Sequence, residues 1–253
     1  MRRIVHQVLS DGGPRTGAAV RFSASRHPTI RHGRKLVGLI CLLALLLPAG
    51  CGWLETRTEA SEDELARQGM RALERGKYRK AMEAFQKLRD WYPFSKYAKL
   101  AELKTADSYF HLGEYDEAVF VYEEFESLHP RNEAVPYVIY QIGQCHFKRM
   151  ESIDRDQTAT RNALETFKRL QRTFPDSSYA DKAGEPIRKC YENLAGHEFY
   201  VGMFYFKSKR YAPAANRFQA VLDNYPDVEE YREKAERYLS LSRERLESET
   251  ASD

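Results

Sequence analysis

The sequence predicts an all-α fold in which helical hairpins stack into a solenoid. Three observations carry this prediction. Small residues, aromatic residues and prolines recur at fixed offsets in four copies along the chain. Between these positions, apolar residues keep the three- and four-residue spacing of amphipathic helices. A single hairpin cannot bury both of its apolar faces, so the copies must pack against one another.

Five positions recur in every copy. A small residue opens each copy: Gly69, Ala106, Gly143 and Gly202. A second small residue lies in the following helix: Ala81, Ala118, Ala163 and Ala214. An aromatic residue comes four positions later: Phe85, Tyr122, Phe167 and Phe218. An apolar residue follows three positions further on: Leu88, Phe125, Leu170 and Val221. A proline stands twelve positions after the alanine: Pro93, Pro130, Pro175 and Pro226. This is the tetratricopeptide pattern.

The clearest copy runs from Leu194 to Pro226 and predicts two helices with a tight break at residues 208–210. Pro213 stands at the start of the second helix, where no backbone donor is needed. Pro226 stands where that helix must stop.

Three irregular stretches refine the prediction. The third copy has an excess of residues around Met150 to Thr160, which indicates a longer loop. The interval between Pro175 and Gly202 is also long, so the first helix of the fourth copy should begin near Lys182 or Pro186. Asp227 to Glu247 is amphipathic and predicts a further helix. We therefore expect four clear repeats plus a C-terminal helix over residues 64–248, with a disordered tail at 249–253.

The N-terminal 50 residues are typical of a signal peptide. A 13-residue apolar run from Leu36 to Pro48 follows basic residues and is too short to span a membrane comfortably. It ends in two small residues and Cys51, which resembles the bacterial lipobox, in which the cysteine is acylated. Residues 51–63 would then be an acylated N-terminus and a flexible tether. The alternative is an ordinary signal peptide in which Cys51 stands by chance.

The charge and the cysteines exclude several classes of function. The formal net charge is +3, but the first 50 residues hold eight of the 40 basic and one of the 37 acidic residues, which leaves −4 for the rest. No nucleic-acid partner is expected, because that needs a basic stripe on the folded domain. No pair of cysteines has CxxC spacing, and the histidines have no catalytic partner in a motif. We expect no enzyme, no cofactor and no metal site. Cys145 and Cys190 are expected to be buried thiols, with a disulfide as the alternative.

Two candidate sites can be read from the residues. Asp154-Arg155-Asp156, in the irregular third copy, suggests either a weak metal site or, preferably, a capping loop, since Asp favours caps and turns. The second site is a stripe along the first helices of the second and third copies, whose spacing places the residues on one helical face. Its members are Leu103, Asp107, Phe110, Tyr137, Tyr140, Gln144 and Phe147. The stripe could hold an extended peptide, with Asp107 and Gln144 supplying hydrogen bonds. Equally, it could pack against the helix of the next repeat.

Particular stretches between the repeats resemble one family, the BamD (ComL/YfiO) lipoproteins of the β-barrel assembly machinery. These stretches are residues 92–98 (YPFSKYA), 154–156 (DRD), 174–180 (FPDSSYA), 194–198 (LAGHE) and 214–217 (AANR). With the lipobox they cover nearly all of residues 51–226. The tail departs from the family, whose members commonly carry a complete fifth repeat.

The resemblance implies a periplasmic, lipid-anchored protein of the outer membrane. It implies binding to the POTRA domains of BamA and to the other Bam lipoproteins, and to segments of unfolded outer-membrane proteins. In the family, an Asn-Arg pair lies near the BamA contact, which maps to Asn216 and Arg217 here. The other interpretation of the same features is a pilotin-like tetratricopeptide lipoprotein that scaffolds pilus or secretin assembly.

Overall fold

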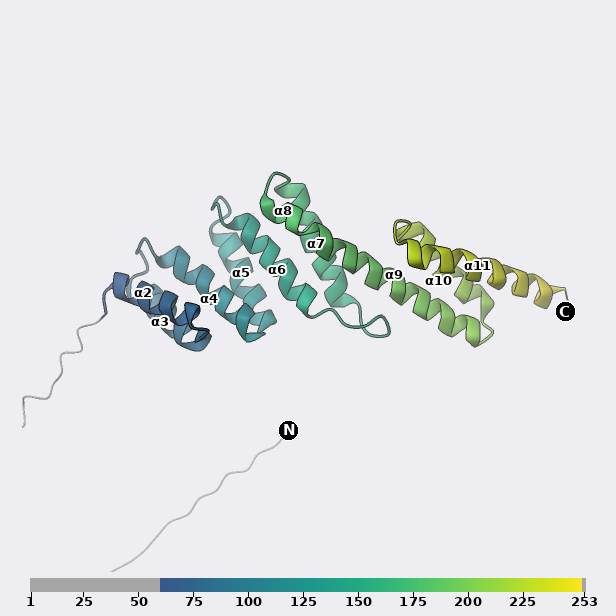
Figure 1. Cartoon of the computed structure of the whole chain (residues 1–253), viewed down its shortest axis with the longest axis horizontal. Coiled ribbons are helices and arrows are strands. Elements are labelled where there is room, and N and C mark those ends of the chain that lie inside the picture. Colours follow the sequence, from purple (N-terminus) through teal and green to yellow (C-terminus); the bar gives the residue numbers. More distant parts are fainter. Residues whose placement is uncertain (1–59, 252–253) are drawn as a thin grey trace, which may run out of the picture. The chain divides into compact units, whose positions relative to one another are not determined.

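The computed structural model describes residues 60–251, and all of the regular secondary structure in that range is α-helical (Figure 1). Four hairpins follow the four predicted copies: α2 (Glu62–Glu74) with α3 (Tyr78–Trp91), α4 (Ala98–Leu112) with α5 (Tyr115–Leu128), α6 (Val135–Lys148) with α7 (Thr158–Thr173), and α9 (Gly184–Lys207) with α10 (Tyr211–Asn224). A short helix, α8 (Ser178–Lys182), precedes α9, and α11 (Glu229–Thr250) ends the array. The predicted signal peptide, Cys51 and most of the predicted tether lie outside the described residues.

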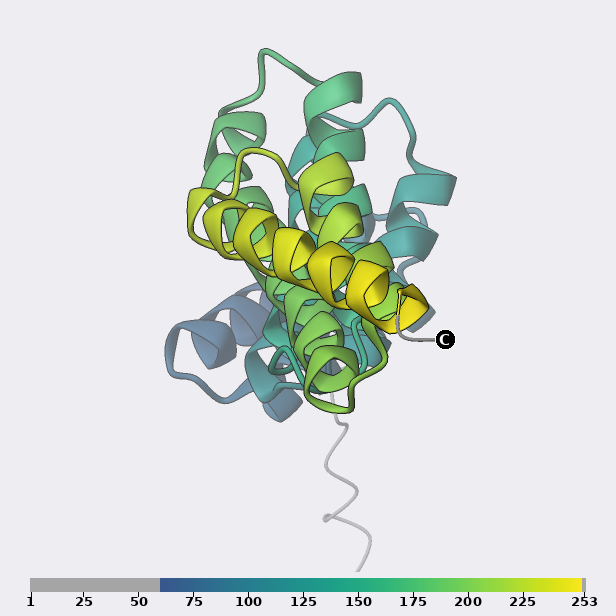
Figure 2. The same cartoon turned by 90° about the vertical axis from the view of Figure 1, so that its right-hand side faces the viewer.

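Each helix from α2 to α7 packs against the next one, and α7 continues the series by packing against α9. At the C-terminal end, α11 contacts both α10 and α9, and Figure 2 shows it lying across them. The described part of the chain is thus a solenoid of hairpins closed by a single helix. This confirms the predicted fold class.

The recurring small and aromatic residues pair inside each hairpin. A Cβ atom added to Gly143 would lie 2.5 Å from the Phe167 ring, and one added to Gly202 would lie 2.6 Å from the Phe218 ring. Gly69 lies equally close to the ring of Phe85. The absent side chain on one helix therefore makes room for the ring on its partner, which brings the two backbones together.

The four prolines end the second helices by the same geometry. The residues before them, Tyr92, His129, Phe174 and Tyr225, all have φ between −135° and −129° and ψ between 47° and 60°. A following proline disfavours the helical region, which explains why each helix stops there. The predicted stop at Pro226 is confirmed.

The turns inside the first, second and fourth hairpins contain a left-handed residue. Gly76 and Gly113 take φ values of 66° and 77°, and Lys209 takes 60° in the fourth hairpin. Lys209 lies in the predicted break at residues 208–210. A lysine in this region is strained relative to glycine.

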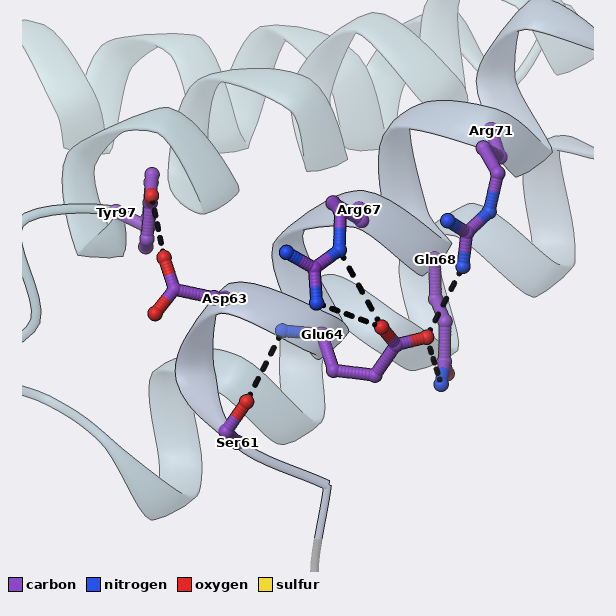
Figure 3. Close-up of polar contacts among 7 residues, drawn as sticks. All are labelled: Ser61, Asp63, Glu64, Arg67, Gln68, Arg71 and Tyr97. Carbon is purple, nitrogen blue, oxygen red and sulfur yellow. Dashed lines mark hydrogen bonds and ion pairs between the residues drawn. The ribbon is translucent and has the colours of Figure 1, made fainter.

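Several boundaries differ from the sequence-based ones. Helix α2 begins at Glu62, inside the segment assigned to the tether, because the Ser61 side chain accepts a hydrogen bond from the N–H of Glu64 and caps the helix (Figure 3). At the other end, helical hydrogen bonding continues to the N–H of Ala251, which donates to Glu247 O. Residues 249 and 250 are therefore helical instead of belonging to a disordered tail. Helix α8 was not anticipated, and α9 begins within the expected interval.

Cys145 and Cys190 are free, buried thiols in two separate apolar clusters. Burial raises the pKa of each thiol to about 12, so neither is a reactive thiolate at neutral pH. The expectation of small buried hydrophobes is confirmed, and the disulfide alternative is not realised.

Candidate partner-binding surface

Asn216 and Arg217 lie on the exposed face of α10. The Arg217 Nη1 atom is 2.8 Å from Glu198 Oε2 on α9, and 44% of the arginine side chain remains exposed. This hydrogen bond is the main reason that the pKa of Arg217 is raised. The ion pair therefore engages Nη1 of the guanidinium while much of the side chain stays accessible to a partner. Asn216 stands beside it, one position away, as the sequence requires.

Helix α9 also makes hydrogen bonds to the insertion of the third repeat, which lies between α6 and α7. The Nδ1 atom of His197 lies 2.7 Å from Ile153 O and must be the protonated donor, since a carbonyl can only accept. The Asn193 side-chain amide donates to Glu151 O at 2.9 Å. A Cβ atom at Gly196 would lie 2.8 Å from both Ile153 Cγ2 and the hydroxyl of Tyr231 on α11. The absence of a side chain at Gly196 therefore lets Ile153 of the insertion and Tyr231 of α11 both pack against α9.

The Asp154-Arg155-Asp156 segment is a capping loop. Asp156 accepts a hydrogen bond from the backbone N–H of Thr158 at the start of α7, and Asp154 accepts one from the Ser152 hydroxyl. Hydrogen bonding to Thr158, first through its side chain and then through its backbone N–H, lowers the pKa of Asp156, and the bond from Ser152 is the first cause of the lowered pKa of Asp154. Inside the loop, the buried side chain of Gln157 donates to the carbonyl oxygens of Ser152 and Arg155. Both aspartates thus serve the loop itself, as the preferred interpretation predicted.

A groove of about 1070 Å³ opens next to this region, between the first half of α9, the insertion and the α10–α11 turn. Tyr191, Tyr225 and Tyr231 line it, with Asp223, Asp227 and Glu230 at the turn. Burial raises the pKa of Tyr225, and the nearby carboxylate of Glu198 adds to that shift. The groove and the Arg217–Glu198 pair are therefore neighbours on the fourth repeat. Sequence reasoning missed both Glu198 and Tyr225, although Glu198 lies in one of the family-like stretches.

The stripe on the first helices points largely into the protein. Asp107 is 6% exposed, and its Oδ1 atom accepts hydrogen bonds from the hydroxyls of Tyr122 and Tyr137, each at 2.6 Å. Its Oδ2 atom is 2.7 Å from the Lys104 ammonium. Burial, and then the charge of Asp107, raise the pKa of both tyrosines. Asp107 is therefore fully engaged within the second repeat and its neighbour.

The other members of the stripe are half-buried. Leu103, Phe110 and Tyr137 pack against the apolar cluster between the second and third repeats, and Tyr140 and Phe147 pack against the next cluster. The ring of Tyr140 contacts Phe167 and also Tyr179 on α8. Gln144 is partly accessible on the same face of α6. Packing against the next repeat, one of the two interpretations of the stripe, describes most of these contacts.

Among residues 60–251, no three His, Cys, Asp or Glu side chains gather in a way that could hold a metal ion. No helix of the same range is both long enough and apolar enough to cross a membrane.

Comparison with known proteins identifies the family of the chain. The model of the YfiO family, described as an outer membrane lipoprotein, matches residues 58–253. The outer membrane protein assembly factor BamD of Rickettsia prowazekii is 32% identical over 193 residues, which cover 76% of this chain and 76% of that protein. BamD of Neisseria meningitidis serogroup A is 29% identical over 218 residues, which cover 81% of each chain. The solved structure of a TPR protein of Thermus thermophilus covers 71% of this chain and 99% of its own, at 17% identity and a TM-score of 0.39, which is too low to carry an argument.

Proposed function

Because the chain belongs to the YfiO family of outer membrane lipoproteins, which includes BamD, we propose that it is a non-enzymatic adaptor that binds BamA during outer-membrane protein assembly. A role in that assembly, and association with the outer membrane, follow from the family itself. The observation that carries the proposal is the family match across the whole described repeat domain. The proposed details are the partner BamA, the surface that binds it and the lipid anchor at Cys51.

The proposed contact with the POTRA domains of BamA is the outer surface of the fourth repeat. Asn216 and Arg217 are exposed there, and Glu198 orients the guanidinium without covering it. A preoriented arginine can donate two parallel hydrogen bonds to an acidic partner residue at little further cost in side-chain entropy. The aromatic groove beside it offers the large rigid side chains that commonly anchor interfaces.

Segments of unfolded outer-membrane proteins are the second proposed class of partner. Asp107 is committed to Tyr122, Tyr137 and Lys104, so it offers little to a bound peptide. The proposed contacts of the stripe are therefore the partly accessible faces of Tyr140, Gln144 and Phe147. The other Bam lipoproteins complete the proposed set of partners.

The proposed anchor is an acylated Cys51 that holds the domain on the periplasmic face of the outer membrane. The support is the lipobox-like sequence and the lipoprotein family. Several acyl chains hold a protein far more firmly than the marginal grip of one chain. A Cys51→Ala variant should lose palmitate labelling and leave the membrane fraction, and normal labelling of this variant would contradict the assignment.

The BamA contact is tested by affinity capture of the acylated chain from detergent-solubilised outer membranes. Wild-type protein should recover BamA, and Arg217→Glu should recover about tenfold less, because a charge reversal at a central contact leaves an acidic partner unpaired. Arg67→Glu is the matched control, since Arg67 forms a comparable exposed ion pair with Glu64 at 2.9 Å on α2 (Figure 3). This control should leave recovery of BamA unchanged.

Two outcomes would count against the adaptor. Wild-type chain that recovers no POTRA-containing protein would overturn it. Depletion that removes secretin multimers while β-barrel proteins stay at normal levels would favour the pilotin-like scaffold instead. If Arg67→Glu and Arg217→Glu weaken capture equally, the contact surface lies elsewhere and only the site assignment fails.

A further inference from the structure

We propose that one edge of the first two repeats rests on the surface of an anionic membrane. This loop edge is formed by the α3–α4 loop, the start of α4 and the α5–α6 loop, through Trp91, Phe94, Lys96, Lys99, Leu128 and Arg131. The inference rests on the lipid anchor proposed above and adds a second point of contact with the same bilayer.

The apolar members of the loop edge are unusually exposed. Phe94 is 101% exposed, Leu128 is 60% exposed and Trp91 is 47% exposed. Trp91 and Leu128 are the last residues of α3 and α5, and Phe94 lies in the loop that follows α3. An exposed phenylalanine at the tip of a loop gains nothing from folding, whereas it gains free energy if it enters a lipid interface.

The two loops form one surface. Lys99, in the first turn of α4, lines a shallow depression together with Leu128 and Arg131 of the following loop. Lys99 therefore connects the Trp91–Phe94 segment to the α5–α6 loop. The edge mixes aromatic and aliphatic groups with basic ones, which is the composition that favours binding in the plane of a membrane interface.

The loop edge lies where the chain from Cys51 enters the domain. The Tyr92 hydroxyl donates to Ala60 O at 3.2 Å, and the Tyr97 hydroxyl donates to Asp63 Oδ1 at 2.7 Å (Figure 3). These bonds tie the α3–α4 loop to the first described residues. Cys51 and Ala60 are nine positions apart, and a fully extended chain of that length spans about 30 Å at most. An acylated Cys51 therefore keeps this edge close to the bilayer.

The loop edge presents three exposed basic side chains, Lys96, Lys99 and Arg131. Lys96 is 3.8 Å from Asp63 and lies over the Tyr97 ring, and its side chain is still 68% exposed. Lys99 and Arg131 are exposed, and Glu133 lines the same depression. The other acidic residues next to the edge face partners of their own: Asp63 faces Lys96, Asp90 faces Arg89, and Glu102 is 2.7 Å from the His129 ring. Each basic residue near an anionic surface adds to the attraction, provided that salt does not screen it. We therefore assign the edge to phospholipid headgroups and the outer part of the acyl chains.

The chain supplies its own reporter, since its two tryptophans are Trp53 and Trp91. In the acylated Trp53→Phe chain, Trp91 is the single tryptophan. We would reconstitute this chain into vesicles of phosphatidylethanolamine and phosphatidylglycerol with brominated acyl chains, and compare them with unbrominated vesicles. Trp91 fluorescence should fall by about half and shift to the blue, because an interfacial indole lies within reach of the bromines. The reporter is matched by a Trp53→Phe/Trp91→Phe/Phe204→Trp chain, whose tryptophan replaces an exposed phenylalanine on α9 and should not be quenched.

The charge is tested in the same chain by Lys96→Glu/Lys99→Glu/Arg131→Glu, with circular dichroism as the check of folding. Quenching of Trp91 should disappear in this variant, while flotation with the vesicles should persist through the acyl chains. Wild-type chain that floats but shows no quenching of Trp91 would overturn the inference and leave the anchor intact. Chain that does not float would overturn both, and equal quenching at Trp91 and at the Phe204→Trp reporter would overturn the assignment to this edge.

Discussion

The second and third repeats share a backbone plan but differ in chemistry at the centre. In the third repeat, Gly143 faces the ring of Phe167, and the contact is wholly apolar. In the second repeat, Ala106 occupies the position of the glycine, and Tyr122 replaces the phenylalanine. The Tyr122 hydroxyl reaches Asp107, which also accepts from Tyr137 on the first helix of the next repeat.

This difference separates the contact that closes a hairpin, Gly143 with Phe167, from a polar cluster that also reaches the next hairpin, Asp107 with Tyr122 and Tyr137. The Gly–Phe contact depends on shape complementarity and on the removal of apolar surface from water. It has no directional polar contact that would select one partner. The Asp107 cluster needs three partners in fixed positions, because a buried carboxylate is costly when its hydrogen bonds are incomplete. The second repeat therefore uses one buried polar cluster both within its own hairpin and toward the next one, whereas the centre of the third hairpin is held by apolar packing alone.

The largest effect should come from Phe167→Ala, which removes the centre of the apolar repeat. We expect the free energy of unfolding to fall by about 3–5 kcal/mol, through lost burial and the cavity left behind. Urea denaturation followed by circular dichroism measures this. Phe120→Ala is the control, since Phe120 is 68% exposed and its loss should change stability by less than about 0.5 kcal/mol. Similar losses in both variants would show that Phe167 is not central.

Tyr122→Phe should come next, because it keeps the ring and deletes one donor to a buried carboxylate. We expect a loss of about 1.5–3 kcal/mol, the usual worth of a hydrogen bond to a charged group. The reciprocal Phe167→Tyr should also destabilise, since its new hydroxyl enters an apolar cluster. If Tyr122→Phe were neutral while Phe167→Tyr cost stability, the polar centre of the second repeat would contribute nothing.

Gly143→Ala tests the closeness of the apolar contact. The new Cβ would lie 2.5 Å from Phe167 Cε1, so the ring or the helix must shift at a cost of about 1–3 kcal/mol. The same exchange in reverse, Ala106→Gly, should cost only about 0.5–1 kcal/mol, from backbone entropy. Equal costs at the two positions would show that the second repeat is packed as closely as the third.

The smallest effect is a dependence on alkaline pH that belongs to the second repeat. Burial raises the pKa of Tyr122 above its ordinary value, so above pH 10 the folded state keeps a proton that the unfolded state loses. The stability linked to this group is complete below about pH 10 and declines by at most about 1.4 kcal/mol per pH unit as pH rises toward the folded-state pKa. Sixteen tyrosines titrate in the whole chain, so the measurement is the difference in slope between wild type and Tyr122→Phe. Parallel slopes would contradict the prediction.

The sequence predicted the hairpins well because the signals were local. A proline acts on the residue before it, and each glycine and the ring that it faces belong to the same short hairpin. The extended first helix of the fourth repeat could be inferred from spacing alone. Helix α8 could not, since five residues carry no periodicity that would distinguish them from a turn.

The candidate sites were less predictable because they depend on neighbours distant in sequence. Helical spacing correctly placed Asp107 on one stripe with Phe110, but it could not show that Tyr122 and Tyr137 would both turn their hydroxyls toward it. Arg217 was identified by resemblance, and its partner Glu198 comes from another helix. Which side chains pair between helices depends on how the helices pack, and that cannot be read from one stretch of the sequence.

The bridge between the insertion of the third repeat and α9 has a consequence for how the domain unfolds. In a linear array of repeats, the free energy of each interface determines how cooperatively two neighbouring repeats unfold. The contacts of His197 with Ile153 O and of Asn193 with Glu151 O add to the interface between the third and fourth repeats. Gly196 brings Tyr231 of α11 to the same place. The C-terminal half therefore opens as one cooperative block, and the surface that carries Arg217 keeps its shape until that whole block melts.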